Sequence, residues 1–116
     1  MRSDGPKPGI LQGSLDLLIL RTLLAGSHHG YAIAKHLHEV SEAFLQVEEG
    51  SLYPALHRLE QRRWVESHWG VSESNRRAKY YQLTAQGRKQ LQKETAAWRK
   101  MAEAVERVLN YRPLEA

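Results

Sequence analysis

The side chains best suited to chemistry lie in two short segments, residues 49–60 and 75–84. In the first, Tyr53 and His57 are four residues apart, so they share one face of any helix formed there. A phenol and an imidazole on one face can hydrogen-bond to base edges in a DNA major groove. Ser51 lies near the expected helix start, where hydroxyl and backbone N–H groups suit a phosphate oxygen.

Two alternatives remain open for this first segment. The Tyr53 ring could instead pack beneath the hairpin that follows, and His57 and Arg58 could form only a solvated helix face. Under the DNA-binding interpretation, Arg58 contacts phosphate, and Pro54 lies on the same outer side.

The second segment is basic. Arg76, Arg77 and Lys79 bracket a predicted turn, and long cations at such a tip can contact a phosphate backbone or enter a minor groove. The surrounding charge supports a polyanionic partner, since residues 51–89 hold 8 Lys and Arg against 3 Asp and Glu, a balance of +5. Residues 1–50 have a balance of −2, from 4 against 6. The alternative is a solvated charge cluster.

Several other classes of function are disfavoured. The chain has no cysteine, and its six histidines show no ligand spacing supported by a carboxylate, so we expect no metal and no cofactor. It also lacks a nucleophile elbow and a glycine-rich phosphate loop, which argues against an enzyme. No segment is long and apolar enough to cross a membrane, and no secretion signal precedes the first helix, so we expect a cytoplasmic protein.

The helices and strands that position these residues can be predicted from the spacing of apolar residues and from the Gly, Pro and capping residues that begin and end such elements. Residues 1–9 resemble a flexible leader, residues 10–84 a DNA-binding domain, and residues 85–116 a helix with a tail. Proline is tolerated only in the first turn of a helix, so the position of Pro54 predicts that the third helix begins near Gly50 or Ser51. The remaining expected elements are helices from Leu11 to the turn at 25–30 and over 31–41, strands over 65–69 and 79–83, and a helix over 85–108 capped by Thr84.

The last helix carries a heptad-like seam. Leu91, Trp98 and Val105 are seven residues apart, which favours pairing with another helix. The first helix is apolar nearly all round, which implies a second covering surface. We therefore expect a two-fold dimer, with an interface formed by Leu15, Leu91, Trp98, Met101, Val105 and Val108. Trp98 has a second interpretation, as the wall of a pocket for a flat aromatic ligand.

The chain resembles the PadR family of transcriptional regulators in three motifs. These are His29-Gly30-Tyr31, the run from Gly50 to Glu60, and the run from Arg76 to Gly87. The resemblance implies a mainly α fold, a winged helix-turn-helix with a two-stranded β-hairpin wing and a long C-terminal dimerisation helix. The single terminal helix is similar to the shorter of the family's two architectures. The chain departs from the pattern at Arg63, where many relatives have glycine.

The resemblance also implies a function. We expect a homodimeric repressor that binds double-stranded DNA at an inverted-repeat operator and is released by a small aromatic effector, as some family members bind planar aromatic compounds at the dimer interface. The alternative is an effector-binding or protein-docking module that keeps the fold without specific DNA binding.

Overall fold

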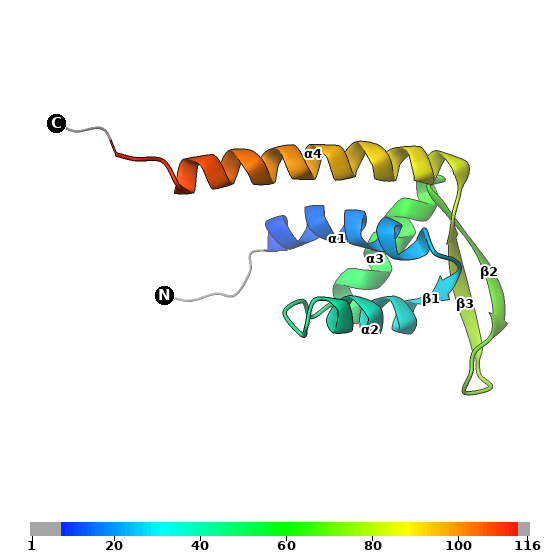
Figure 1. The fold of residues 1–116 in the computed structure, drawn as a ribbon. Coiled ribbons are helices and arrows are strands. Elements are labelled where there is room, and N and C mark those ends of the chain that lie inside the picture. The colour runs from blue at the N-terminus through cyan, green and yellow to red at the C-terminus, as the bar shows by residue number, and fades with distance from the viewer. Residues whose placement is uncertain (1–7, 114–116) are drawn as a thin grey trace.

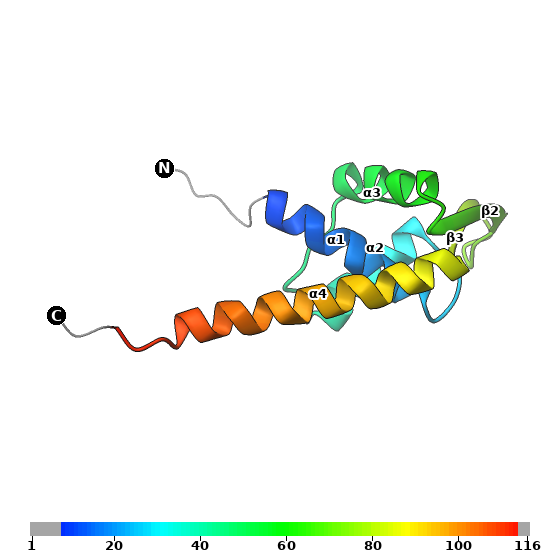
Figure 2. The same cartoon turned by 90° about the horizontal axis from the view of Figure 1, so that it is seen from above.

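The computed structural model describes residues 8–113, with side chains from Ser14 onward. Three helices form a bundle, a small sheet closes one end of it, and a long helix runs across the bundle and past it (Figures 1 and 2). The elements are α1 (Pro8–Leu23), β1 (His28–His29), α2 (Gly30–Val40), α3 (Glu49–Gln61), β2 (Val65–Val71), β3 (Arg77–Leu83) and α4 (Ala85–Leu109). The mainly helical winged-helix fold is therefore confirmed.

The sheet has one more strand than the sequence predicts. Strands β2 and β3 form the expected hairpin, and β1 pairs antiparallel with β3 through His28↔Tyr81 and His29↔Tyr80. The turn predicted over residues 25–30 begins as expected, but His28 and His29 form a strand. The strand was missed because two residues are too few to show the alternation that identifies strands.

One helix start differs from expectation, and a second start is close to the predicted one although its premise fails. Helix α1 begins at Pro8, where proline suits a first helical position, so the last two residues of the expected leader are helical. Residues 1–7 lie outside the described residues. Helix α3 begins at Glu49, which makes Pro54 its sixth residue. The premise that Pro54 must lie in the first turn was wrong, because the helix accommodates its missing N–H and keeps the ring exposed.

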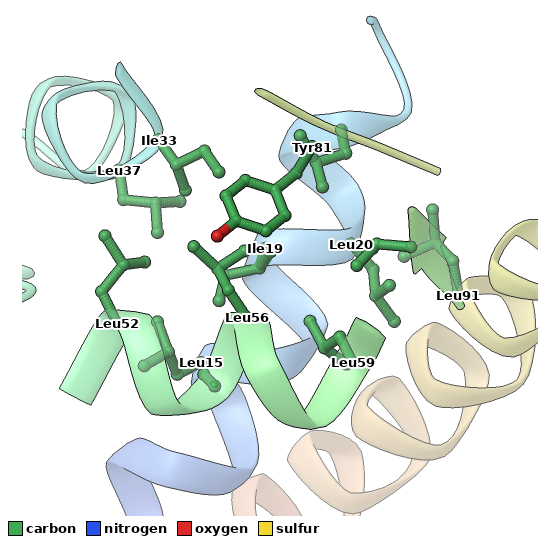
Figure 3. Close-up of a cluster of buried hydrophobic side chains, with 13 residues drawn as sticks. Leu15, Ile19, Leu20, Ile33, Leu37, Leu52, Leu56, Leu59, Tyr81 and Leu91 are labelled. Carbon is green, nitrogen blue, oxygen red and sulfur yellow. The ribbon is translucent and has the colours of Figure 1, made fainter. Parts of the chain in front are cut away.

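The core gathers side chains from every helix and from the sheet (Figure 3). Leu52, Leu56 and Leu59 of α3 face inward as predicted and are fully buried. Leu15 and Leu91, which we expected at a dimer interface, are only 1% and 5% exposed within the single chain. This corrects their assignment, because they retain almost no surface to offer a partner.

The apolar character of α1 therefore has an explanation inside one protomer. Helix α1 lies between α4 and the other two helices and also contacts β3. A helix covered from several directions needs apolar residues nearly all round its surface. The expectation of a dimer must then depend on α4 alone.

A tight turn connects α3 to the wing, which is the β2–β3 hairpin. The N–H of Trp64 donates to the Leu59 carbonyl at 3.1 Å, and the N–H of Arg63 donates to the Glu60 carbonyl at 3.0 Å. This is the hydrogen-bond pattern of a Schellman helix end, and Arg63 has the left-handed backbone that it requires, with φ of 65°. The turn thus keeps its sharpness although arginine replaces the glycine of many relatives.

The same turn holds the start of α4. As predicted, Thr84 caps α4, since its hydroxyl accepts from the N–H of Gly87 at 3.0 Å. The hydroxyl also donates to the Arg63 carbonyl at 2.7 Å. Gly87 packs so closely that an added Cβ would lie 2.0 Å from the Trp64 carbonyl oxygen. Helix α4 is therefore fixed to the end of α3 by backbone contact.

Candidate nucleic-acid interface

The outer face of α3 presents most of the polar groups predicted for it. Pro54 and His57 are exposed, Tyr53 is 43% exposed, and Ser51 is half-buried near the helix start. Because α3 buries only its leucine side against the core, this face lies on the surface of the protomer. It is the surface that a recognition helix offers to a major groove.

The motif at the start of α2 determines where the Tyr53 ring lies. An added Cβ at Gly30 would lie 2.6 Å from the Tyr53 hydroxyl oxygen, so glycine leaves the space that the ring fills. His29 caps the same helix, with Nδ1 accepting from the N–H of Ala32 at 3.2 Å. The Tyr53 ring therefore packs against the first turn of α2 and keeps nearly half of its surface open.

Arg58 points away from the outer face. Its guanidinium donates to the Asp16 carboxylate of α1 at 2.9 Å, and Arg58 is half-buried. The pair joins α3 to α1. Arg58 therefore differs from the expectation of an available phosphate contact, because an acidic group in the same protomer already binds it.

One face of the wing is directed toward the helices. Its cross-strand pairs are Val65↔Leu83, Ser67↔Tyr81, Trp69↔Lys79 and Val71↔Arg77. Side chains along this face change from buried at Val65 to exposed at Val71, because the hairpin extends past the helical bundle. We call it the inner face of the wing.

Glu60 ties the wing to α3. Its carboxylate accepts from the Ser67 hydroxyl at 2.6 Å and lies 3.7 Å from the Lys79 ammonium. Burial, followed by the charge of Glu60, raises the pKa of the Tyr81 phenol above its ordinary value of 10.0. Lys79 is therefore a half-buried, paired cation, whereas Arg76 and Arg77 are exposed near the wing tip.

The tip of the wing is a compact turn. The N–H of Asn75 donates to the Ser72 carbonyl at 2.9 Å, and the N–H of Ser72 donates to the Arg76 carbonyl at 2.7 Å. Asn75 has φ of 62°, a left-handed backbone that asparagine tolerates better than most residues. The turn places Arg76 and Arg77 where β3 begins.

These pieces surround one groove. A space of about 800 Å³ separates the start of α2 and Tyr53 from the wing. Its lining combines aromatic rings with cations, namely Tyr31, Tyr53, Trp69, Arg76, Arg77 and Lys79. Sequence reasoning missed Tyr31 and Trp69, although period-two alternation from Val65 places Trp69 on the inner face.

A second groove is apolar and lies away from the wing, beside α1. It has a volume of about 1030 Å³ and runs between α1, α4 and the connection from α2 to α3. Leu17, Leu18, Phe44 and Trp98 are among its lining residues, and Trp98 is 49% exposed. The structure thus places Trp98 at a groove edge, while Met101, Val105 and Val108 stay exposed farther along α4.

Among the side chains that the structure describes, no three or more His, Asp or Glu residues gather as metal ligands would. No helix of residues 8–113 combines the length and the apolar character of a membrane span.

Three helices pack together, the third exposes its outer face, and a basic hairpin lies beside it. This arrangement defines a winged helix-turn-helix protein. A family model described as the transcriptional regulator PadR-like family matches residues 19–93, more than half of the chain. The chain therefore belongs to the PadR-like family of transcriptional regulators, which bind DNA and are not enzymes. This confirms the resemblance inferred from the three motifs.

Solved structures agree with this assignment. A PadR family transcription regulator from Clostridium difficile R20291 is 31% identical, with a TM-score of 0.72 over 83% of this chain and 98% of that one. A PadR-like regulator from Bacillus cereus ATCC 14579 is 28% identical, with a TM-score of 0.76 over 90% and 99%. In sequence, the chain is 29% identical over 106 residues to an uncharacterized protein of Lysinibacillus sphaericus, covering 91% and 93% of the two chains.

Proposed function

We propose that this protein is a cytoplasmic, homodimeric repressor that binds an inverted-repeat operator and is released by a small aromatic effector. The observation that carries the proposal is the groove shared by the outer face of α3 and the cationic wing. It supports binding in which α3 reads bases while the wing holds the adjacent backbone.

Within this proposal, Ser51, Tyr53 and His57 contact the operator from α3, and Pro54 packs beside them. His57 hydrogen-bonds to a base edge, because it is exposed and lies one helical turn from Tyr53. Arg76 and Arg77 contact phosphates. Arg58 and Lys79 contribute less, since the Asp16 and Glu60 carboxylates largely neutralise their charges.

The dimer is proposed on the far part of α4. Trp98, Met101, Val105 and Val108 expose apolar side chains at helical spacing, and the helix extends past the bundle (Figure 2). Burying such surfaces between two helices contributes about 25 cal/mol for each Å² of apolar area. A two-fold axis there would present two α3 helices to successive turns of one DNA face.

The effector is proposed for the apolar groove beside Trp98. An indole at its edge suits a flat aromatic ligand, and apolar lining side chains from α1 and the α2–α3 connection surround the space. The same groove borders the proposed dimer surface, which supports release of DNA through a change between subunits.

The test is fluorescence anisotropy with a labelled duplex taken from upstream of the protein's own gene. We expect saturable binding that excess random DNA does not abolish, and a stoichiometry of two chains per duplex. Binding that random DNA displaces as readily as the upstream duplex, across a tiled set of upstream fragments, would favour the docking-module alternative.

A further inference from the structure

The inner face of the wing carries an exposed indole that the core does not use. Trp69 is 58% exposed and lies outside the buried cluster. It shares its strand face with Val65, which is buried, but it lies four residue pairs closer to the wing tip. Core packing therefore does not account for a tryptophan at this position.

Arg77 covers this indole. Its guanidinium carbon lies 4.5 Å from the centre of the Trp69 ring. Since Trp69 pairs with Lys79 and Val71 pairs with Arg77, the two side chains are diagonal neighbours on the same face of the hairpin. The distance is that of a cation–π pair, with the cation over the aromatic face.

Arg77 also differs from Arg58 and Lys79, each of which lies beside a carboxylate of the same chain. Arg58 binds Asp16 at 2.9 Å, and Lys79 lies 3.7 Å from Glu60. Among residues 8–113, no carboxylate pairs with Arg77. Its positive charge is thus available to a ligand in the groove, which it lines together with Tyr53 and Trp69.

Contact with an aromatic ring can reduce the entropy that an arginine side chain loses when it binds an anion. A long arginine side chain loses rotamer freedom when it binds, and a ring beneath the guanidinium restricts that freedom beforehand. A guanidinium that stacks flat on a ring uses only its flat face. Its N–H edge can then donate the two parallel hydrogen bonds that a phosphate accepts.

We propose that Trp69 is a positioning residue that holds the Arg77 guanidinium toward a DNA phosphate beside the half-site read by α3. The proposal rests on the proposed DNA-binding function and adds a specific role for a side chain of the wing. Trp69 acts through Arg77, so its contribution disappears when Arg77 is absent.

A double-mutant cycle on the full-length dimer tests this dependence, with dissociation constants for the upstream duplex as the measurement. Arg77→Ala should weaken binding about tenfold, the loss of one charge-assisted contact. Trp69→Ala should weaken it about two- to fivefold, as removal of an exposed cation–π pair does. The double variant should stay within about twofold of Arg77→Ala alone.

Two further variants separate positioning from general damage to the wing. Trp69→Phe keeps an aromatic face and should recover most of the affinity lost in Trp69→Ala. Val71→Ala removes another exposed apolar side chain from the same strand face and should leave affinity nearly unchanged. Equal losses for Val71→Ala and Trp69→Ala would overturn the proposal.

The inference and the proposed function fail in different ways. If the wild-type protein binds the upstream duplex specifically but the two single losses multiply in the double variant, Trp69 acts independently of Arg77 and the inference is wrong. The inference is also wrong if Trp69→Ala binds the upstream duplex with the affinity of the wild type. If the wild-type protein shows no specific binding, the proposed function fails, and the inference fails with it.

Discussion

Arg63 has a backbone conformation that usually favours glycine. Its φ of 65° satisfies the helix end of α3, and a side chain there costs about 1 kcal/mol relative to glycine. Glycine also makes the unfolded chain more flexible, which offsets part of the gain. We expect Arg63→Gly to raise the free energy of unfolding by about 0.5 kcal/mol in urea denaturation.

Arg62 is the matched control for this prediction. It precedes Arg63, carries the same charge and has an ordinary φ of −82°. Arg62→Gly should therefore lower the free energy of unfolding, by about 1 kcal/mol. Equal destabilisation by both glycine variants would show that the left-handed backbone at Arg63 costs nothing.

Glycine is required at position 87 because the backbone of α4 there contacts the backbone at Trp64. A Cβ there would lie 2.0 Å from the Trp64 carbonyl oxygen, so Gly87→Ala must displace α4 from the end of α3. We expect a loss of about 2–3 kcal/mol in the free energy of unfolding. Gly50→Ala is the control, since nothing lies within 4 Å of its added Cβ, and it should be neutral or stabilising. Similar effects of the two alanines would contradict the packing described at Gly87.

At the residue scale, sequence reasoning identified residue types better than it identified partners. Tyr53 and His57 could be assigned to one helix face because helical periodicity is local. The Asp16–Arg58 pair could not be predicted, because it joins residues 42 positions apart through the packing of two helices. The burial of Leu91 was missed for the same reason, since a heptad pattern does not distinguish a partner helix from the protein's own core.

We expect the wing to be the element whose contribution to DNA binding depends most on salt. Each phosphate contact adds about 0.9 to the magnitude of the slope of log affinity against log salt concentration. Replacing Arg76 and Arg77 together with alanine should flatten that slope by up to about two units, and the preferred sequence should stay the same. Anisotropy titrations at several salt concentrations provide the measurement.

A charge-matched control exists on α4. Arg99 and Lys100 are both exposed, and they lie on the helix rather than on the wing. Replacing these two with alanine removes the same charge and should change the slope much less, since distant exposed charges are screened. An unchanged slope in the wing variant, with affinity intact, would mean that the wing does not touch DNA.

The order of the helices and strands was predictable because turn residues, a proline and an N-cap mark the boundaries of these elements in the sequence. Thr84 was identified as a cap and forms one. Strand β1 was not predictable, because its two residues become a strand only through pairing with Tyr80 and Tyr81. Local sequence thus determines long elements, while a short edge strand depends on the tertiary structure.

At the scale of the whole molecule, we expect two chains to associate. Light scattering at micromolar concentration should report a dimer, because α4 leaves Trp98, Met101, Val105 and Val108 exposed in the single chain. Met101→Lys should shift the population toward monomer, since pairing would bury its charge.

Glu103→Lys is the control for the dimer prediction. Glu103 is exposed and lies about 140° around the helix from Trp98, so a lysine there should leave the mass unchanged. A monomeric wild-type protein would contradict the dimer. Equal dissociation by both lysine variants would place the interface elsewhere on α4.

The central claim is that the outer face of α3 reads sequence. The most direct measurement compares dissociation constants for the upstream duplex and a scrambled duplex of equal length, for the wild type, Tyr53→Ala and His57→Ala. Each variant should lose about tenfold or more on the upstream duplex and much less on the scrambled one, because base contacts carry the discrimination. His36→Ala, which removes an exposed histidine of α2, should leave the ratio of the two constants unchanged. Equal losses on both duplexes for Tyr53→Ala and His57→Ala would contradict the account.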